Sequence, residues 1–230
     1  MLVNIINKRL RKFKGDNYQL DKRIPNAYLV KVIITRLIMK LRGLVSRINY
    51  EGIPFIGRGV SIIDRSKIKI GKGVTIGNRC IIDALSTDGI IFGNNVSVGR
   101  NTIIECTGSL QFLGKGMKVG DNVGLGTNNF YGCAGGIEVG DDTIMGNFVS
   151  FHAENHVYSD LTKVIRLQGV IQNGIKVGKN CWIGAKSTIL DGAIIEDGCI
   201  IAAGAVVGAG IYEKNGIYGG VPAKLIKRRN

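Results

Sequence analysis

A six-residue period in the large apolar residues is the feature that most constrains the fold of this chain. An α-helix places its apolar residues three and four positions apart and a half-buried strand places them two apart, so neither element alone explains a period of six. A fixed period over most of a chain indicates a repeat architecture. The large positions are Ile56, Ile62 and Ile68; Ile70, Ile76 and Ile82; Phe92, Val98 and Ile104; Val119, Leu125 and Tyr131; Val139, Met145 and Phe151; and Val177, Ile183, Ile189, Ile195, Ile201 and Val207.

A small residue stands four positions after many of the large ones. We interpret each hexad as a short strand with its large residue pointing inward, followed by a turn where only a small residue fits. Three hexads then close one triangular coil of about 18 residues, and successive coils stack at the spacing of hydrogen-bonded strands, about 4.8 Å. The small positions are Val74, Cys80, Val96, Thr102, Val123, Thr143, Val149, Cys181, Ser187, Ala193, Cys199 and Ala205.

Glycine supplies 34 of the 230 residues, about twice its usual share. Many glycines directly follow a large position, where a turn backbone with positive φ favours them. Three cysteines, Cys80, Cys181 and Cys199, occupy small positions, which gives them a packing role. The five cysteines form no C-x-x-C pair and the chain has only two histidines, so we expect no metal site. The turn glycines are Gly71, Gly77, Gly93, Gly99, Gly120, Gly126 and Gly178.

The hexads resemble those of the hexapeptide-repeat acyltransferase family, closest to its sugar and polysaccharide O-acetyltransferases, over about residues 53–226. This resemblance implies an all-β fold, a left-handed parallel β-helix, and the homotrimer that is usual in the family. We expect a basic N-terminal helical segment over residues 1–52, the β-helix over residues 53–208, and a tail over residues 209–230 that contacts coenzyme A. In that tail, the run LIKRR after Pro222 predicts a short C-terminal helix.

The formal net charge of +14 lies at the two ends of the chain. Residues 1–50 carry 12 Lys and Arg against 2 Asp and Glu, residues 51–223 are balanced at 15 against 15, and the last seven residues add four basic side chains. A nucleic-acid-binding protein usually has its basic residues spread over the surface that contacts the nucleic acid. Here they lie at the two ends around a neutral middle, so we expect no nucleic-acid partner. The chain has no secretory cleavage pattern at its start and no apolar run near the length of about 18 residues that spans a membrane, so we expect a cytoplasmic protein.

Residues 26–48 predict an amphipathic helix, with Pro25 just before it and Asn26 as a candidate cap. Its broad apolar stripe is bordered by basic side chains. Two interpretations stay open: the helix covers the open end of the β-helix, or it lies on anionic lipid and places the protein at the inner face of the membrane. The stripe contains Ile33, Leu37, Leu41, Leu44 and Ile48, and the basic border contains Lys31, Arg36, Lys40, Arg42 and Arg47.

The hexad register is interrupted between Phe151 and Val177, which are 26 positions apart instead of six. About 20 residues therefore leave the coil as a loop over about residues 154–173, and long loops inside compact repeats are usually functional. Both histidines of the chain lie at the root of this loop, His152 directly after Phe151 and His156 four positions later.

His156 is the predicted general base. A histidine with the ordinary pKa of about 6.5 accepts a proton at neutral pH. The run Glu154-Asn155-His156 is similar to the catalytic histidine motif of the family's sugar acetyltransferases, at the same offset from the inward residue. The resemblance implies catalysis by His156, and we expect acceptor contacts from Glu154 and Tyr158. The group that orients His156 stays open between Glu154 and a backbone carbonyl.

The run NCWIGA over residues 180–185 is similar to the family signature N-V-W-I-G-[AS]. The resemblance implies that the backbone N–H of Ala185 stabilises the oxyanion of the reacting thioester and that Trp182 contacts the pantetheine arm or the acceptor. The resemblance also implies that the A-G pair in the later run IAAGAVV lets the arm approach the backbone and that the basic residues after G-x-P contact the coenzyme phosphates. The expected coenzyme-binding residues are Trp182, Gly184, Ala185, Ala203, Gly204, Lys224 and Lys227.

The acceptor motif of the family is only partly present. Galactoside and maltose acetyltransferases carry N-F-Y-x-N, whose last Asn helps to hold the acceptor hydroxyl. Asn129, Phe130 and Tyr131 match this motif, but Cys133 stands at the final position. We therefore expect a different acceptor, with Asn128 or Asn129 as the substitute contact.

The sequence thus predicts an acetyl-CoA-dependent O-acetyltransferase that acts on a sugar hydroxyl of a bacterial surface polysaccharide or its precursor. Acetyl-CoA is the acyl donor and no metal is expected. Two alternatives stay open: an N-acetyltransferase of an amino sugar, and a non-catalytic β-helix scaffold. A zinc hydratase on the same fold is disfavoured because it needs three histidine ligands and the chain has two.

Overall fold

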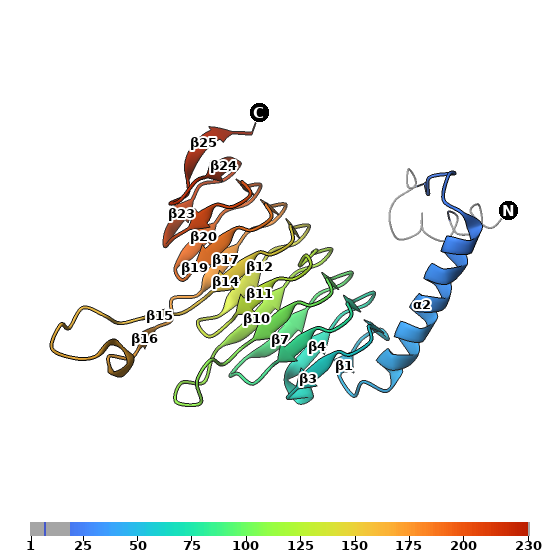
Figure 1. Cartoon of the computed structure of the whole chain (residues 1–230), viewed down its shortest axis with the longest axis horizontal. Helices are drawn as coiled ribbons and strands as arrows, with labels where there is room; N and C mark the ends of the chain where they lie inside the picture. The colour runs from blue at the N-terminus through green and yellow to red at the C-terminus, as the bar shows by residue number, and fades with distance from the viewer. Residues whose placement is uncertain (1–6, 8–18, 230) are drawn as a thin grey trace.

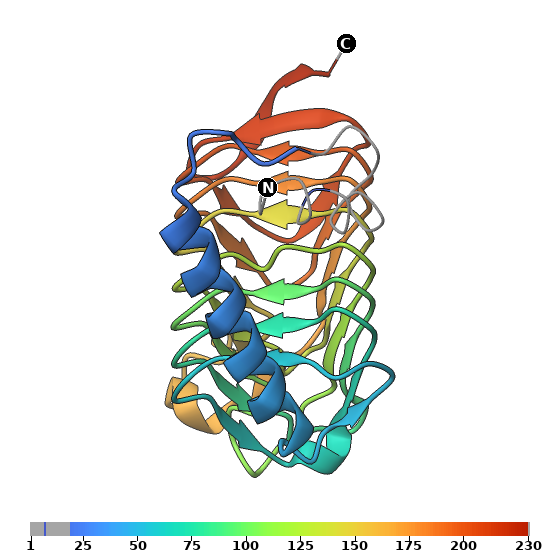
Figure 2. The ribbon, with the colours of Figure 1, turned by 90° about the vertical axis from the view of Figure 1, so that its right-hand side faces the viewer.

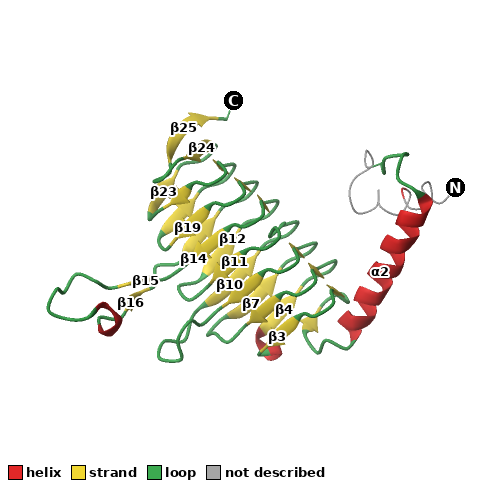
Figure 3. Ribbon diagram, viewed as in Figure 1, coloured by secondary structure: helices red, strands yellow, loops and turns green. Residues whose placement is uncertain are grey.

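The computed structural model describes residue 7 and residues 19–229. Its body is a three-sided prism of stacked coils, with short strands on the sides and turns at the corners (Figure 1, Figure 3). Among the described strands, all pairs are parallel except β15 with β16 and β24 with β25. The expected left-handed parallel β-helix with one N-terminal helix is confirmed.

We call the three sides of the prism face A, face B and face C. Each coil contributes one strand to each face in that order along the chain. Face A contains β1 (Asn49–Tyr50), β4 (Ile68–Ile70), β7 (Gly89–Phe92), β10 (Gly116–Val119), β12 (Ile137–Val139), β17 (Ile175–Val177), β20 (Ala193–Ile195) and β23 (Gly210–Tyr212). Face B contains β2 (Phe55–Ile56), β5 (Thr75–Ile76) and β8 (Ser97–Val98), then β13 (Ile144–Met145), β18 (Trp182–Ile183), β21 (Ile200–Ile201), β24 (Gly216–Gly219) and β25 (Lys224–Arg228), the two groups being joined by single bridges through Gly124. Face C contains β3 (Ser61–Ile63), β6 (Ile81–Asp83), β9 (Ile103–Glu105), β11 (Phe130–Gly132), β14 (Ser150–His152), β19 (Thr188–Leu190) and β22 (Val206–Val207).

The inward residues stack directly on one another because the strand register keeps the hexads in phase. On face A, for example, Val139 pairs with Val177, which pairs with Ile195 one 18-residue coil later. Every large position predicted from the period is buried except Ile62, which is half-buried in the first complete coil. All twelve predicted small positions are buried as well, so the interpretation of the hexad as strand plus tight corner is confirmed.

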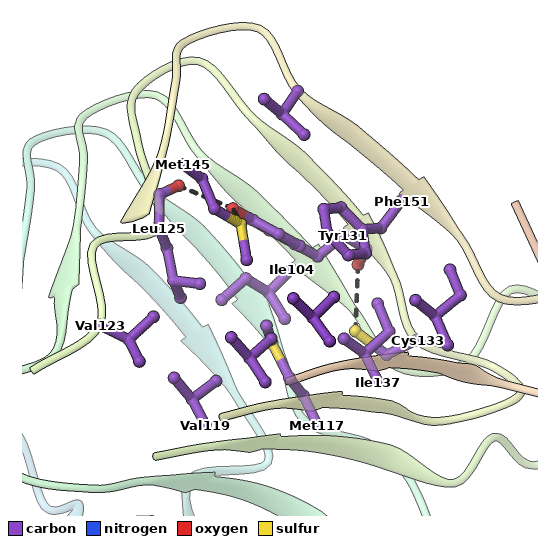
Figure 4. Close-up of a cluster of buried hydrophobic side chains, with 14 of the residues drawn as sticks. Ile104, Met117, Val119, Val123, Leu125, Tyr131, Cys133, Ile137, Met145 and Phe151 are labelled. Atoms are coloured by element: carbon purple, nitrogen blue, oxygen red, sulfur yellow. Dashed lines mark hydrogen bonds between the residues drawn. The ribbon is translucent and has the colours of Figure 1, made fainter. Parts of the chain in front are cut away.

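Polar groups lie among the buried apolar side chains of the prism, such as Tyr131 and Leu125 in Figure 4, and some of them link neighbouring coils. The hydroxyl of Tyr131, which is fully buried, donates a hydrogen bond of 2.7 Å to the carbonyl of Leu125. Next to it, the Asn129 amide donates to the carbonyls of Leu125 at 2.8 Å and Gly146 at 3.0 Å and accepts from the backbone N–H of Val149 at 2.9 Å. One buried amide therefore ties two successive coils together.

The five cysteines are buried and unpaired. Burial raises the pKa of the Cys80 and Cys199 thiols, and it raises the pKa of Cys181 to about 11. Since thiolate is the reactive form, the raised pKa lowers the reactivity expected of Cys80, Cys181 and Cys199 at neutral pH. Burial agrees with the packing role predicted for Cys80, Cys181 and Cys199 at small positions.

The N-terminal helix α2 (Asn26–Leu44) is four residues shorter than predicted. Pro25 occupies the N-cap position and Asn26 is the first helical residue, with no side-chain cap. The chain turns at Arg47, which has a positive φ of 55°, and Ile48 then enters the core. A continuous helix to residue 48 is excluded by this turn, because the first coil must begin there.

The helix does not cover the open end of the β-helix. Its side chains Leu29 and Met39 are buried, but most of the predicted apolar stripe is exposed. It contacts the prism chiefly at β2, where Gly43 packs against the backbone of Pro54. In Figure 1 the rest of α2 inclines away from the prism, and Figure 2 views it from the side that faces away from the coils. The covering interpretation is therefore wrong.

The predicted C-terminal helix is also wrong. Residues Lys224–Arg228 form β25, an antiparallel partner of β24. The physical reason is that β24 is the last strand of face B and would otherwise expose an unpaired edge. The returning chain satisfies that edge, and Arg228 and Arg229 add contacts to Glu213 and to the carbonyl of Gly198.

Between β14 and β17 the chain leaves the prism as a projecting hairpin, which we call the arm (residues 154–173; Figure 1). Its two sides are joined by the antiparallel strands β15 (Asn155–His156) and β16 (Val170–Ile171). Its outer part contains a short 3-10 helix, η2 (Ile165–Leu167). A second 3-10 turn, η1 (Arg65–Lys67), lies in the first coil.

Candidate active site

The arm holds His156 on β15, with its backbone paired to Val170. The side chain is exposed. Within the described part of the chain, no hydrogen bond engages its imidazole ring. Both ring nitrogens are therefore available to a substrate, as a general base requires.

Glu154 lies at the root of the arm, where one carboxylate oxygen accepts a hydrogen bond of 2.7 Å from Nε2 of Gln172. This bond joins the two sides of the arm, just before β15 and just after β16. It therefore fixes the root of the arm next to His156. Gln172 was not predicted, because its partner is 18 residues away in the sequence. Tyr158 lies further along the arm and is 72% exposed.

His152 differs from His156 in its surroundings. It ends β14 on face C, and its ring centroid lies 5.5 Å from that of Phe130. Partial burial against this ring lowers the pKa of His152. The lowered pKa favours the neutral form of His152, which faces outward beside the root of the arm.

The corner between faces B and C, which we call the B–C corner, contains the NCWIGA run. Each coil turns here through a residue with positive φ: Arg79, Asn101, Asn128, Phe148, Lys186 and Gly204. The backbone N–H of each of these residues donates to a carbonyl in the preceding coil, as Gly204 does to Ala185 at 2.9 Å. The turn geometry is therefore the same in every coil and does not depend on a glycine.

The residue just before each of these turns has a backbone N–H without a described acceptor, in the earlier coils (Asn78, Arg100, Thr127 and Asn147) as in the last two. In the described structure, no acceptor takes a hydrogen bond from the backbone N–H of Ala185 or Ala203. Gly146 and Gly184 make room beside them: a Cβ on Gly146 would lie 2.6 Å from the nitrogen of Ala185, and one on Gly184 would lie 2.5 Å from that of Ala203. A row of outward N–H groups with glycines beside it can stabilise negative charge on a bound oxygen.

Gly204 makes the end of this corner open. Its φ is +72°, and no described atom lies within 4 Å of the position that a Cβ would take. Trp182 stands next to the corner on face B, 52% exposed and paired with Ile144 and Ile200. The structure thus brings Trp182, Gly184, Ala185, Ala203 and Gly204 together along one ridge.

Lys224 and Lys227 lie on β25, at the carboxyl end of face B and beyond β24. Face B runs in the order β18, β21, β24 and β25. Trp182 and the two lysines therefore share one face, with two strands between them. Both lysine side chains are exposed and available to an anion.

Within one chain, His156 and Ala185 lie at different corners. The arm leaves the corner between faces C and A, after β14, whereas Ala185 lies at the B–C corner, before β19. The hollow on face A near the arm, about 420 Å³ in volume, is lined by none of the predicted site residues. His156 and the ridge thus lie at two separate places on one chain.

Asn129 is not available to an acceptor. It is 2% exposed, and its amide is fully engaged with backbone groups of two coils. The sequence contains the signal for this: Asn129 stands four positions after Leu125, at the small inward position. Asn128 has a positive φ at the B–C corner and accepts a hydrogen bond of 2.8 Å from Asn101. The expected acceptor role of Asn129 is therefore replaced by a structural one.

Among the described residues, no group of three or more His, Cys, Asp and Glu side chains is placed to hold a metal ion. In the same part of the chain, no helix has the length and apolar character needed to cross a bilayer.

Two family descriptions match the chain. "Bacterial transferase hexapeptide (six repeats)" matches residues 174–209, and "Hexapeptide repeat of succinyl-transferase" matches residues 67–106. The first of these segments contains the candidate coenzyme ridge from Trp182 to Gly204.

A probable acetyltransferase of Mycobacterium tuberculosis is 34% identical over 182 residues, which are 78% of this chain and 51% of that protein. The chain thus spans about half the length of this curated relative.

Among solved structures, AntD, an N-acyltransferase from Bacillus cereus in complex with dTDP and 3-hydroxybutyryl-CoA, is similar with 20% identity and a TM-score of 0.51, covering 92% of each chain. A variant of AntD in complex with dTDP-4-amino-4,6-dideoxyglucose and coenzyme A gives 22% identity and a TM-score of 0.51, covering 78% of this chain and 84% of that one. At this identity the similarity establishes the fold. The chain thus contains hexapeptide repeats in the two matched segments and has the left-handed β-helix fold.

Proposed function

We propose that this protein is an acyltransferase that uses acyl-CoA and transfers an acetyl group to a sugar hydroxyl. The observation that carries the proposal is the open position at Gly204, next to the unengaged N–H groups of Ala185 and Ala203. A pantetheine arm can lie along this ridge only because side chains are small or absent there. The probable acetyltransferase that shares 34% identity supports the same class of reaction.

The proposed reaction needs no covalent enzyme intermediate. His156 takes the proton of the acceptor hydroxyl while the hydroxyl oxygen attacks the thioester carbonyl carbon. The N–H of Ala185 donates to the oxygen that becomes negatively charged in the tetrahedral intermediate. The C–S bond then breaks, the thiolate of coenzyme A leaves, and His156 returns the proton to it. Lys224 and Lys227 contribute positive charge for the coenzyme phosphates.

Acyl transfer by this route requires a second copy of the chain, because the base and the ridge lie at different corners of one prism. Face C, which separates them, carries an apolar column in which Ile81 pairs with Ile103 and Ile103 with Phe130. Ile81 and Ile103 are 44% and 37% exposed. Packing of a second copy on this column brings an arm toward the neighbouring B–C corner, as a homotrimer with shared sites would.

The activity is tested by measuring thiol release from acetyl-CoA with a panel of sugars and oligosaccharides as acceptors. We expect release that depends on a carbohydrate and a product whose acetyl group is removed by hydroxylamine, as an O-ester is. An acetyl group that resists hydroxylamine would assign the protein to amino-sugar N-acetylation instead. If Gly204→Asn binds coenzyme A with the same affinity as the wild type, the proposed position of the coenzyme is wrong.

The shared site is tested by complementation. We expect the His156→Ala chain to be inactive and the Gly204→Asn chain to keep about a tenth of the wild-type activity or less at low acetyl-CoA concentration. Co-expressed in equal amounts, they should recover about a quarter of the wild-type activity, because a site needs an intact base from one copy and an intact ridge from another. Mixed oligomers without recovered activity would place the base and the ridge of one site in the same chain.

A further inference from the structure

The helix α2 presents two different sides. One side faces the prism: Met39 and Gly43 are buried, and Nη1 of Arg36 donates a hydrogen bond of 2.8 Å to the hydroxyl of Thr75. The Arg36 guanidinium also lies 4.9 Å from the centre of the Phe55 ring. These contacts fix the rotation of the helix about its axis and decide which residues point away from the protein.

The side that points away is apolar. At 3.6 residues per turn its members fall on one stripe, and their exposed fractions lie between 38% and 63%. An apolar surface of this extent on a soluble domain marks a place of contact with another phase or molecule. The stripe consists of Val30, Ile33, Ile34, Leu37, Ile38, Leu41 and Leu44.

The charges on α2 identify the kind of surface that fits. Lys31 and Arg42 lie along one border of the stripe and Lys40 along the other, and residues 26–44 contain no Asp or Glu. Packing the same helix from a second copy against the stripe would bring like charges together with no carboxylate on either helix to pair with them. A surface with negative charges around an apolar interior fits both the stripe and its borders.

We propose that α2 docks on a membrane that contains anionic lipid, lying in the interface plane with its apolar stripe directed into the acyl region. Lys31, Lys40 and Arg42 then lie at the level of the headgroup phosphates. The helix binds the surface without crossing it, because no described helix is long and apolar enough to span. The Arg36 contacts keep the prism on the aqueous side.

The experiment is flotation of the full chain with vesicles of phosphatidylcholine, with and without phosphatidylglycerol. We expect binding that requires phosphatidylglycerol and weakens as salt is raised. Leu37→Glu with Leu41→Glu should lower partitioning tenfold or more, since both side chains are exposed and their replacement leaves the fold intact. Replacement of Lys31, Lys40 and Arg42 by Gln should lower binding and remove most of its salt dependence.

The matched control carries the same two substitutions elsewhere. Leu110→Glu with Leu113→Glu alters two exposed leucines in a loop of the prism and should bind vesicles like the wild type. Equal flotation of the wild type and the Leu37/Leu41 variant would overturn the proposal. A smaller oligomer for that variant in lipid-free light scattering, with no change in flotation, would assign the stripe to a second copy.

Discussion

The buried amide of Asn129 gives a sharp prediction for stability. In Asn129→Ala, the backbone N–H of Val149 loses its acceptor and the carbonyl of Gly146 loses a donor, whereas the Leu125 carbonyl keeps the Tyr131 hydroxyl. An unsatisfied buried polar group costs about 1–3 kcal/mol. The Val149 N–H is buried and the Gly146 carbonyl is part-buried, so we expect a loss of about 2–3 kcal/mol in the free energy of unfolding, against about 5–15 kcal/mol for a typical folded domain.

Asn128→Ala is the matched control, because Asn128 is adjacent and, within the described residues, its side chain takes part in a single hydrogen bond, accepted from Asn101. Its positive φ of 57° makes Ala cost about 1 kcal/mol there. The assay is denaturant unfolding followed by far-UV circular dichroism at one fixed protein concentration, with amide exchange of Val149 as the local readout. In Asn129→Ala this amide should exchange faster than in Asn128→Ala.

Equal stabilities of the two variants would refute the reasoning. So would a raised KM for the acceptor in Asn129→Ala with unchanged stability, because that result would return Asn129 to the acceptor site.

Three further predictions concern the ridge, the thiols and His152. Gly204→Asn should change the free energy of unfolding by less than about 1 kcal/mol, because Asn tolerates positive φ. It should raise the KM for acetyl-CoA about tenfold or more, which corresponds to about 1.4 kcal/mol of binding. An unchanged KM would place the coenzyme elsewhere. Treatment of the native protein with iodoacetamide at neutral pH should leave activity intact, because burial raises the pKa of Cys80, Cys181 and Cys199; rapid inactivation would show an accessible thiolate. Since burial lowers the pKa of His152 in the folded state, the unfolded chain binds a proton first as pH falls, so stability decreases below about pH 6.5. His152→Gln should lose that part of the decrease in thermal melts, and an unchanged pH profile would contradict it.

The coils were predictable from the sequence because inward packing repeats locally. Each large residue, such as Ile183 or Ile201, needs only its own hexad and the one stacked on it, so period and burial agree. The same rule identifies Asn129 as an inward residue once it is counted from Leu125. The family motif at residues 129–131 instead favoured an acceptor contact, and the hexad phase was the better guide.

The ends of the chain were less predictable because they depend on distant partners. LIKRR forms a strand because β24 offers an unpaired edge, which no local propensity reveals. The rotation of α2 is set by the contacts of Arg36 with Phe55 and Thr75. Thr75 is 39 residues away in the sequence, and the two partners lie on β2 and β5 of successive coils. For the candidate site, the motifs indicated the ridge and the arm, but only the order of the faces shows that they lie at two separate places on one chain.

The central claim is that His156 acts as the base in acyl transfer from acetyl-CoA, and the most direct test compares kcat of His156→Ala with that of His152→Ala. A general base contributes about 10²–10⁴ to the rate. The account predicts a loss of that size for His156→Ala, and for His152→Ala a kcat within a few fold of the wild type. Retained activity in His156→Ala, or the larger loss in His152→Ala, would contradict it.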